Sequence, residues 1–334
     1  MLRSLMGRRR LFGACAAATA MAAGCGGEPP PKPPSTLRVV ATTMQIGDLV
    51  REIAARRADL KVLMGPGADP HTYKPTAADA AAMAKADLVF HNGLGLEAGL
   101  SALLARPGSK SVAVSATLPE LALIPAGEDR TDPHIWLDPR LWKVAAGVVA
   151  GALIRVDREG EPAYRFNLQR LAADLDGAAL DAYRQIARIP EARRVLVTSH
   201  DAFAYLGRAY GLKTHGLSGP AGGAAPDEKA LKQAVEFIVQ NKAPAVFAET
   251  SQPAGAIDRL LAECARQGVA VQGGKGSGLV LYSGAMGAVG EREGYAVDMY
   301  LGMYRYNVET IVRALLAPPA PPGARPGPTK GPGG

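Results

Sequence analysis

The sequence predicts an α/β protein in which two parallel-sheet lobes are joined by one long, rigid linking helix. Short runs rich in Val, Ile and Leu alternate with longer helical stretches, a pattern typical of parallel sheets with helices on both faces. These runs form two sets, and the segment between them, 141–189, has almost no strand signal. The chain has 334 residues, 48% of them hydrophobic, which is enough for two domains of ordinary size.

The two sets of apolar runs predict one lobe each. The first set predicts an N-terminal lobe over 37–155, with strands at 37–43, 60–64, 87–92 and 111–116 and helices at 45–57 and 76–86. The second set predicts a C-terminal lobe over 190–316, with strands at 194–200, 212–218, 244–250 and 269–274 and a helix at 254–267.

The linking helix is predicted from the segment between the two sets. A first helix begins there, because Asp138 can cap it and Pro139 suits the first helical position. The run DREGEP at 157–162 interrupts that helix. From 163 to 189 apolar residues recur near helical spacing, so we assign the linking helix to 156–189.

The two ends of the chain are expected to lie outside the folded part. Residues 1–24 have a basic start and an apolar run too short to anchor in a bilayer, which predicts a signal peptide. The run ends in AAGC, which resembles a bacterial lipobox and predicts that Cys25 is lipidated as the first mature residue. Export through the general or the twin-arginine route stays open. A Pro-rich spacer follows at 25–36, and a disordered Pro/Gly-rich tail is expected at 317–334.

Charge and cysteine content exclude two classes of partner and site. The formal charge of +7 includes four arginines within 1–24, so the chain without that segment is near +3. With no cluster of basic and aromatic residues, we expect no nucleic-acid partner. After removal of Cys15 and lipidation of Cys25, Cys264 stays alone, which excludes an intrachain disulfide and a cysteine-based zinc site.

Three of the five histidines predict a metal site. His71 and His134 both stand in the triplet Asp-Pro-His, and His200 ends a predicted strand. Each lies where the carboxyl end of a strand opens into a crevice, which is where open α/β sheets bind ligands. Proline stiffens the backbone before the first two histidines, and three imidazoles from three loops suit a transition metal. A polar histidine at a strand end is the alternative interpretation.

The other candidate residues are weaker. His91 ends a strand before a glycine turn and His215 lies within an apolar-alternating run, so both are interpreted as structural. Asp298 precedes an apolar C-terminal helix and is the candidate for a fourth, carboxylate ligand. Ordinary stabilisation of a helix N-terminus by an acidic residue explains Asp298 equally well.

Four blocks of the chain together resemble a known family. They are GADPHTYKPTAADAAAMAKADLVFHNGLGLE, DPHIWLDP, VLVTSHDAFAYLGRAYGL and AVDMYLGMYRYNVETI. In this order they resemble the zinc/manganese solute-binding lipoproteins of ABC metal importers, known as cluster A-I. The resemblance covers nearly all of 37–316. It implies two α/β lobes joined by a long rigid helix, with the metal bound between the lobes.

The resemblance implies a ligand set and a transport function. The implied metal ligands are His71 and His134 from the N-terminal lobe and His200 and Asp298 from the C-terminal lobe. The implied protein is no enzyme but an exported, periplasmic or cell-surface lipoprotein. It would be a membrane-anchored monomer that delivers metal to an ABC importer permease.

The choice of metal follows from the ligand types. Three imidazoles and one carboxylate favour zinc first and manganese second. Manganese-selective relatives often have Glu at the third position, where this chain has His200. Zinc-specific relatives often carry a His-rich loop between the first two ligands. In this chain the segment between them, 72–133, has a single histidine, His91.

Two other functions stay open at this point. One is a zinc-dependent hydrolase with Asp298 or Glu249 as general base, although no sequence motif indicates an oxyanion donor or a substrate cleft. The other is a metal-binding adhesin or storage lipoprotein, which shares every residue with the transport interpretation.

Overall fold

The sheet of the N-terminal lobe has four parallel strands in the order β2-β1-β3-β4. The computed structural model describes residues 36–106, 110–127, 129–222, 225–253, 255–274 and 276–318. The predicted signal peptide, Cys25 and most of the predicted spacer and tail lie outside these residues. The four predicted strands are confirmed, and they run over β1 (Leu37–Ala41), β2 (Ala58–Val62), β3 (Leu88–His91) and β4 (Ser111–Ala113).

Side-chain caps start the helices of this lobe. Helix α1 (Met44–Ala54) begins where the Thr43 side chain accepts a hydrogen bond from the amide of Ile46, and a short 3-10 turn (Ala55–Arg57) follows it. Helix α2 (Ala77–Lys85) begins with a capping box between Thr76 and Asp79. Helix α3 (Ser101–Leu104) is a single turn.

The C-terminal lobe repeats the strand order of the first lobe. Its parallel sheet runs β6-β5-β7-β8, so β5 and β7 occupy the places that β1 and β3 occupy in the other lobe. The elements are β5 (Val195–Thr198), α6 (Ala204–Tyr210), β6 (Lys213–Gly216), α7 (Glu228–Asn241), β7 (Val246–Glu249), α8 (Ala256–Arg266) and β8 (Val280–Leu281).

One predicted strand of this lobe is wrong. The run at 269–274 makes only an isolated bridge between Gln272 and Ala245, and the fourth strand lies later, at β8. The physical reason is the glycine pair that follows the apolar alternation. Gly273 and Gly274 both have positive φ, and a Cβ on Gly273 would lie 2.5 Å from a methyl group of Val246. The chain therefore turns away from the sheet instead of pairing along it.

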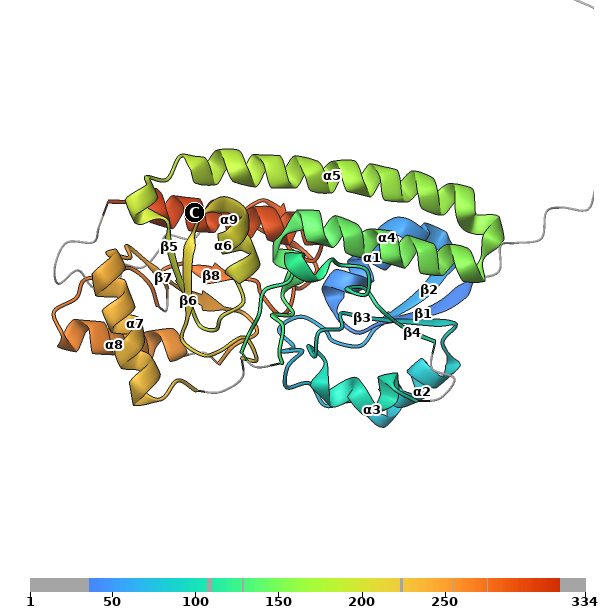
Figure 1. Cartoon of the computed structure of the whole chain (residues 1–334), viewed down its shortest axis with the longest axis horizontal. Helices are drawn as coiled ribbons and strands as arrows, with labels where there is room; N and C mark the ends of the chain where they lie inside the picture. The colour runs from blue at the N-terminus through green and yellow to red at the C-terminus, as the bar shows by residue number, and fades with distance from the viewer. Residues whose placement is uncertain are drawn as a thin grey trace, which may run out of the picture. The chain divides into compact units, whose positions relative to one another are not determined.

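Two consecutive helices join the lobes. Helix α4 (Pro139–Val156) begins at the predicted cap, where Asp138 accepts from the amide of Arg140. A 3-10 turn (Arg158–Gly160) separates it from the long helix α5 (Glu161–Ala187). Helix α5 packs on α4 and α1 of the first lobe and on the C-terminal helix α9 (Tyr300–Leu316), as Figure 1 shows. A small antiparallel hairpin of β9 (Glu291–Arg292) and β10 (Tyr295–Ala296) precedes α9.

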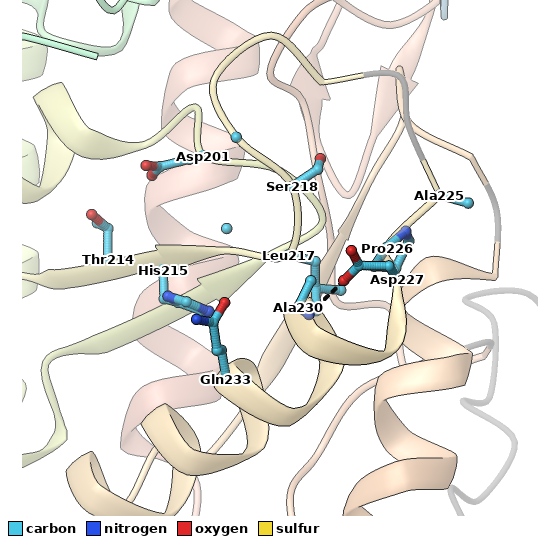
Figure 2. Close-up of a pocket in the computed structure, with 12 residues that line it drawn as sticks. Asp201, Thr214, His215, Leu217, Ser218, Ala225, Pro226, Asp227, Ala230 and Gln233 are labelled. Atoms are coloured by element: carbon cyan, nitrogen blue, oxygen red, sulfur yellow. Dashed lines mark hydrogen bonds between the residues drawn. The ribbon is translucent and has the colours of Figure 1, made fainter. Parts of the chain in front are cut away.

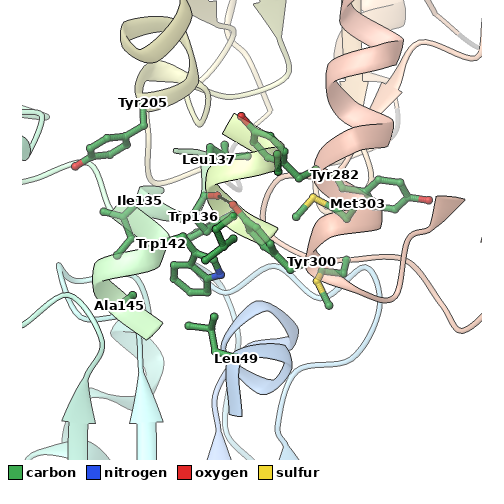
Figure 3. Packing of buried hydrophobic residues seen from close by; sticks show 14 of the residues in the cluster. Leu49, Ile135, Trp136, Leu137, Trp142, Ala145, Tyr205, Tyr282, Tyr300 and Met303 are labelled. Atoms are coloured by element: carbon green, nitrogen blue, oxygen red, sulfur yellow. Dashed lines mark hydrogen bonds between the residues drawn. The ribbon is translucent and has the colours of Figure 1, made fainter. Parts of the chain in front are cut away.

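One hydrophobic core runs through both lobes. It includes Leu49 and Trp142 from the first lobe and Tyr205, Tyr282 and Met303 from the second, drawn together in Figure 3. A second, smaller cluster lies between β5, β7, α7 and α8. Because the larger core crosses from lobe to lobe, the two sheets are held in one packed body, and all described residues belong to one compact unit, 35–334.

Tyr300 fastens the start of α9 to the first lobe. Its hydroxyl donates to the backbone oxygen of Trp136 at 2.7 Å, and its amide donates to Asp48 at 3.0 Å. Its ring stacks on Trp142 with centroids 5.8 Å apart. Trp136 in turn donates its indole N–H to the backbone oxygen of Ser283 at 2.9 Å. These bonds are buried, so they fix the register between the lobes.

The hydroxyl of Tyr300 is therefore expected to contribute measurably to stability. We predict that Tyr300→Phe lowers the free energy of unfolding by about 1–2 kcal/mol, because a buried acceptor loses its partner. The matched control is Tyr295→Phe, whose hydroxyl donates to the exposed Glu309 and should matter by less than about 0.5 kcal/mol. Urea unfolding of the purified protein measures both, and equal changes would contradict the prediction.

Candidate metal centre

Three histidines that are far apart in the sequence meet at one point. His71 lies in the loop after β2, His134 directly precedes the 3-10 turn Ile135–Leu137, and His200 follows β5. The Nε2 atom of His134 lies 3.2 Å from Nε2 of His71 and 3.2 Å from Nε2 of His200. The ligand atoms of all three lie within 4.8 Å of one another. We call these residues the three-histidine cluster.

The spacing of these nitrogens fits a tetrahedral metal. Nitrogens bound roughly 2.0–2.1 Å from zinc lie roughly 3.3 Å apart at the corners of a tetrahedron. The two measured separations from His134 are 3.2 Å. A neutral imidazole carries one proton, so the Nε2 of His134 cannot donate to both neighbours. Three lone pairs that converge at this distance are the arrangement that a cation requires.

The repeated Asp-Pro-His triplet has the same local geometry both times. Oδ1 of Asp69 accepts from the amide of His71 at 3.0 Å, and Oδ1 of Asp132 accepts from the amide of His134 at 2.9 Å. The proline between each pair fixes φ and cannot compete as a donor. Each triplet is thus a stiff turn that aims one imidazole, which explains why the sequence contains it twice.

Carboxylates behind two of the imidazoles orient them. Oδ1 of Asp132 lies 2.7 Å from Nδ1 of His134, and Oε2 of Glu249 lies 2.6 Å from Nδ1 of His200. The other oxygen of Glu249 accepts from the amide of His200 at 2.8 Å. Asp132 thus accepts the Nδ1 proton of His134, and Glu249 places negative charge beside Nδ1 of His200. Both contacts favour a proton on Nδ1, which leaves the Nε2 lone pair free for a metal.

Burial and charge set the protonation of the cluster. Burial, with His134 and His200 nearby, lowers the pKa of His71 to about 3. Burial also lowers the pKa of His134 well below its ordinary value, and His200 adds to that effect. For His200 the burial effect is outweighed by Glu249, which leaves its pKa above the ordinary value. Two of the three imidazoles are therefore neutral and ready to bind at neutral pH.

The cluster stands at the carboxyl ends of the central strands. His200 follows β5 and Glu249 ends β7, the two neighbours between which the strand order of the second sheet changes direction. In the first lobe Asn92, just after β3, donates to the backbone oxygen of Pro133 at 2.9 Å. The buried Glu97 accepts from the amide of Asn92 at 2.7 Å. The loop that carries His134 is thereby tied to its own sheet.

Sequence reasoning missed several of these supporting residues. Glu97 and Asn92 carry no motif, since their contacts depend on the fold. Asp132 was visible only as the residue that precedes a proline. Glu249 was considered a general base, but both of its oxygens are bonded to His200. The only sequence signal for a supporting carboxylate was the position of Asp132, two residues before the candidate ligand His134.

The other two histidines lie elsewhere. His91 ends β3 and is partly buried. His215 lies on β6, stacks on Phe237 with centroids 4.7 Å apart, and lines a separate pocket of about 460 Å³ with Asp201 and Gln233. Figure 2 shows this pocket between β6 and α7. Neither histidine belongs to the three-histidine cluster.

Asp298 is not brought into the three-histidine cluster. Among the described residues, the group of ligand atoms contains the three imidazoles and no carboxylate oxygen. Asp298 is partly exposed, two residues before α9, where Tyr300 is bonded to Asp48 and Gly302 packs tightly on the backbone of Ala296. These contacts hold the start of α9 against α1. The role of Asp298 as a ligand stays a prediction.

Comparison with known proteins places the chain in a family. Residues 39–314 match the family described as the zinc-uptake complex component A, periplasmic. The chain belongs to this family. The resemblance noted in the sequence to solute-binding proteins of metal importers is thus confirmed.

Individual members of the component A family are similar over most of their length. The chain is 36% identical to the manganese-binding lipoprotein MntA of Bacillus subtilis, over 92% of this chain and 99% of MntA. It is 38% identical to the zinc-binding protein TroA of Treponema pallidum, over 83% of this chain and 88% of TroA.

A solved structure of the component A family has the same fold. The periplasmic zinc binding protein TroA from Treponema pallidum superimposes with a TM-score of 0.79 at 35% identity, over 84% of this chain and 99% of that one. The predicted fold of two parallel-sheet lobes with a long helix between them is confirmed. In the described part of the chain no helix combines the length and apolar character that a membrane span requires.

The carboxylates behind the imidazoles are expected to influence metal affinity. We predict that Glu249→Gln weakens zinc binding about 10- to 100-fold. A neutral amide would orient the imidazole of His200 less well than the carboxylate does, and it would leave that imidazole less basic. His215→Gln in the same lobe is the matched control and should change affinity by less than about tenfold, or 1.4 kcal/mol. Competition titration with a zinc chelator measures both. Equal losses in the two variants would argue against an orienting role of Glu249.

Proposed function

We propose that this chain is an extracytoplasmic solute-binding protein that captures a divalent transition metal and delivers it to the permease of an ABC importer. The observation that carries the proposal is the convergence of three imidazole Nε2 atoms at metal-ligand spacing, one of them from the opposite lobe. His71, His134 and His200 would hold the ion. Membership of the component A family supports the same function.

Zinc is the proposed metal, with manganese second. Imidazole nitrogen suits zinc, while manganese prefers oxygen ligands. At a nitrogen-rich site zinc also stands above manganese in the order of affinities for divalent metals. The relatives divide between the two metals, since TroA is named for zinc and MntA for manganese.

The two alternative functions gain no support. A hydrolase would need a carboxylate beside the metal that is free to act as base. Glu249 is held by contacts with His200, and Asp298 is not among the clustered ligand atoms. An adhesin or storage role uses the same metal site, so only a transport measurement separates it from import. We propose that this chain has no hydrolytic activity and acts as a monomer beside its permease.

Metal analysis and uptake together test this function. The purified protein is expected to hold one zinc per chain by elemental analysis, and His134→Gln is expected to hold none. Cells lacking the gene should take up radioactive zinc slowly at low external zinc, with uptake restored by the natural chain but not by His134→Gln. Normal uptake without the gene would reject a transport role.

The anchoring residue is proposed from the sequence and the relatives. Cys25 follows the lipobox-like run, and MntA is named a lipoprotein. We predict that Cys25→Ala moves the protein from the membrane fraction to the soluble fraction, because no lipid can be attached. Fractionation and immunoblotting measure this. A variant that stays membrane-bound and uncleaved would show that residues 1–24 are an anchor.

Metal affinity is expected to fall in acid. A metal binds the neutral imidazole, and the pKa of His200 lies above its ordinary 6.5 because Glu249 outweighs the effect of burial. Affinity should therefore be full above that pKa and fall about tenfold per pH unit below it, as one proton competes for Nε2. Zinc titrations between about pH 8.5 and pH 5.5, which bracket the ordinary pKa of histidine, measure this.

The variant Glu249→Gln provides the control for this acid effect. Without the carboxylate the pKa of His200 should fall, so the decline should begin at a lower pH than in the natural protein. A decline that begins at the same pH in both proteins would mean that His200 is not the group that binds the competing proton.

A further inference from the structure

We propose that a ligand from solvent, a water molecule that small anions can replace, completes the metal coordination in place of a protein carboxylate. This inference rests on the proposed function, since it assumes that the three-histidine cluster binds a metal. The nitrogen separations of 3.2 Å on either side of His134 match two edges of a tetrahedron, which fits three imidazoles at three of its corners and leaves the fourth corner open.

The carboxylates around the cluster are occupied behind the imidazoles. Asp132 bonds the Nδ1 and the amide of His134, and Glu249 bonds the Nδ1 and the amide of His200. These contacts place both groups on the side of each ring that faces away from Nε2. Neither carboxylate can reach the metal without giving up these buried contacts to its histidine.

The third carboxylate is also occupied. Oδ1 of Asp69 accepts from the amide of His71 at 3.0 Å, and Oδ2 accepts from the hydroxyl of Thr72 at 3.1 Å. These bonds make the turn that aims His71. If Asp69 rotated toward the metal, it would release the turn that presents another ligand.

The second lobe presents neutral groups to the loop that carries His71. A Cβ built on Gly284 would lie 3.0 Å from Pro70, the residue before His71, and 2.9 Å from the hydroxyl of Ser251. The amide of Gly284 donates to that hydroxyl at 3.2 Å, and Ser283 lies at the same distance from it. Where the second lobe lies close to Pro70, it thus presents Gly284 and the hydroxyl groups of Ser251 and Ser283, with little room for a longer side chain.

The three imidazoles differ in their exposure to solvent. His134 and His200 are fully buried, whereas His71 is only partly buried. The side of the cluster at His71 is therefore the one through which water or a small anion would approach the metal. Asp132 and Glu249 offset part of the charge of a divalent ion from behind the rings, but no anionic group contacts the ion itself, so its open corner favours a small anion.

A solvent ligand also has a consequence for delivery. Metal transfer to a partner begins when one bond to the ion is exchanged for another. A corner held by water gives an incoming ligand of the permease a place to bind before any imidazole leaves. The three protein ligands can then be released one at a time.

Cobalt(II) spectroscopy tests this inference, because the visible absorption of tetrahedral cobalt responds to each of its ligands. In the cobalt-loaded natural protein we expect azide and thiocyanate to shift the visible bands in a saturable way, with cobalt still bound at one ion per chain. A spectrum that does not respond to either anion would overturn the inference.

One variant separates a solvent ligand from a protein carboxylate. Asp298→Ala should retain the anion response and bind zinc within about threefold of the natural protein. A loss of a hundredfold or more in this variant, about 2.7 kcal/mol, would identify Asp298 as the fourth ligand and overturn the inference.

The failure of the proposed function would look different. In that case the natural protein and His134→Gln would bind cobalt and zinc equally weakly, and no cobalt spectrum would form. If cobalt binds tightly to the natural protein alone but ignores azide and thiocyanate, the metal-binding function stands and only the solvent ligand is rejected.

Discussion

Trp136 connects the metal centre, the lobe interface and the C-terminal helix, and the rest of the site depends on its position. Its ring packs edge-on against His134 with centroids 5.2 Å apart. Its indole N–H donates across the interface to Ser283, and its backbone oxygen accepts from Tyr300. Because the side chain is almost fully buried, these contacts cannot be exchanged for water. The imidazole of His134 is thus held against a surface that belongs to both lobes.

In the three-histidine cluster the carboxylates lie behind the imidazole rings and do not contact the ion directly. The imidazoles supply neutral nitrogen, and Asp132 and Glu249 supply negative charge through the Nδ1 protons. A carboxylate in direct contact with the ion would add a strong bond that must be broken at release. Charge placed behind the ring raises the basicity of the imidazole without that bond. The arrangement suits a protein that must bind metal tightly and also give it up.

The sequence predicted the fold and the imidazoles well because both leave short-range signals. Seven of eight strands were visible as apolar runs, and the Asp-Pro-His triplets marked His71 and His134 through local turn chemistry. The eighth strand was misplaced, since positive-φ glycines at 273–274 end the pattern after a single bridge, between Gln272 and Ala245. A run of alternating residues does not reveal whether a neighbouring strand is available to pair with it.

The carboxylates show where sequence reasoning stops. Asp298 and Glu249 each stand at the end of an element and look alike as candidate ligands. Only the packing separates them, because Glu249 ends the strand beside His200 while Asp298 precedes a helix that Tyr300 fastens to α1. Such differences arise from contacts between residues 49 and 252 positions apart, which composition and spacing do not encode.

The division of ligands between the lobes sets the path of release. The first lobe provides His71 and His134, and both lie on turns stiffened by proline. The second lobe provides His200, held by Glu249 on the neighbouring strand. The long helix α5 packs on helices of both lobes, and the core continues across the interface, so a wide opening of the lobes would expose buried apolar surface. A small shift of the loop after β5 breaks the one bond from the second lobe and leaves the ion on two imidazoles. Such a local movement at His200 would expose less apolar surface than a separation of the lobes would.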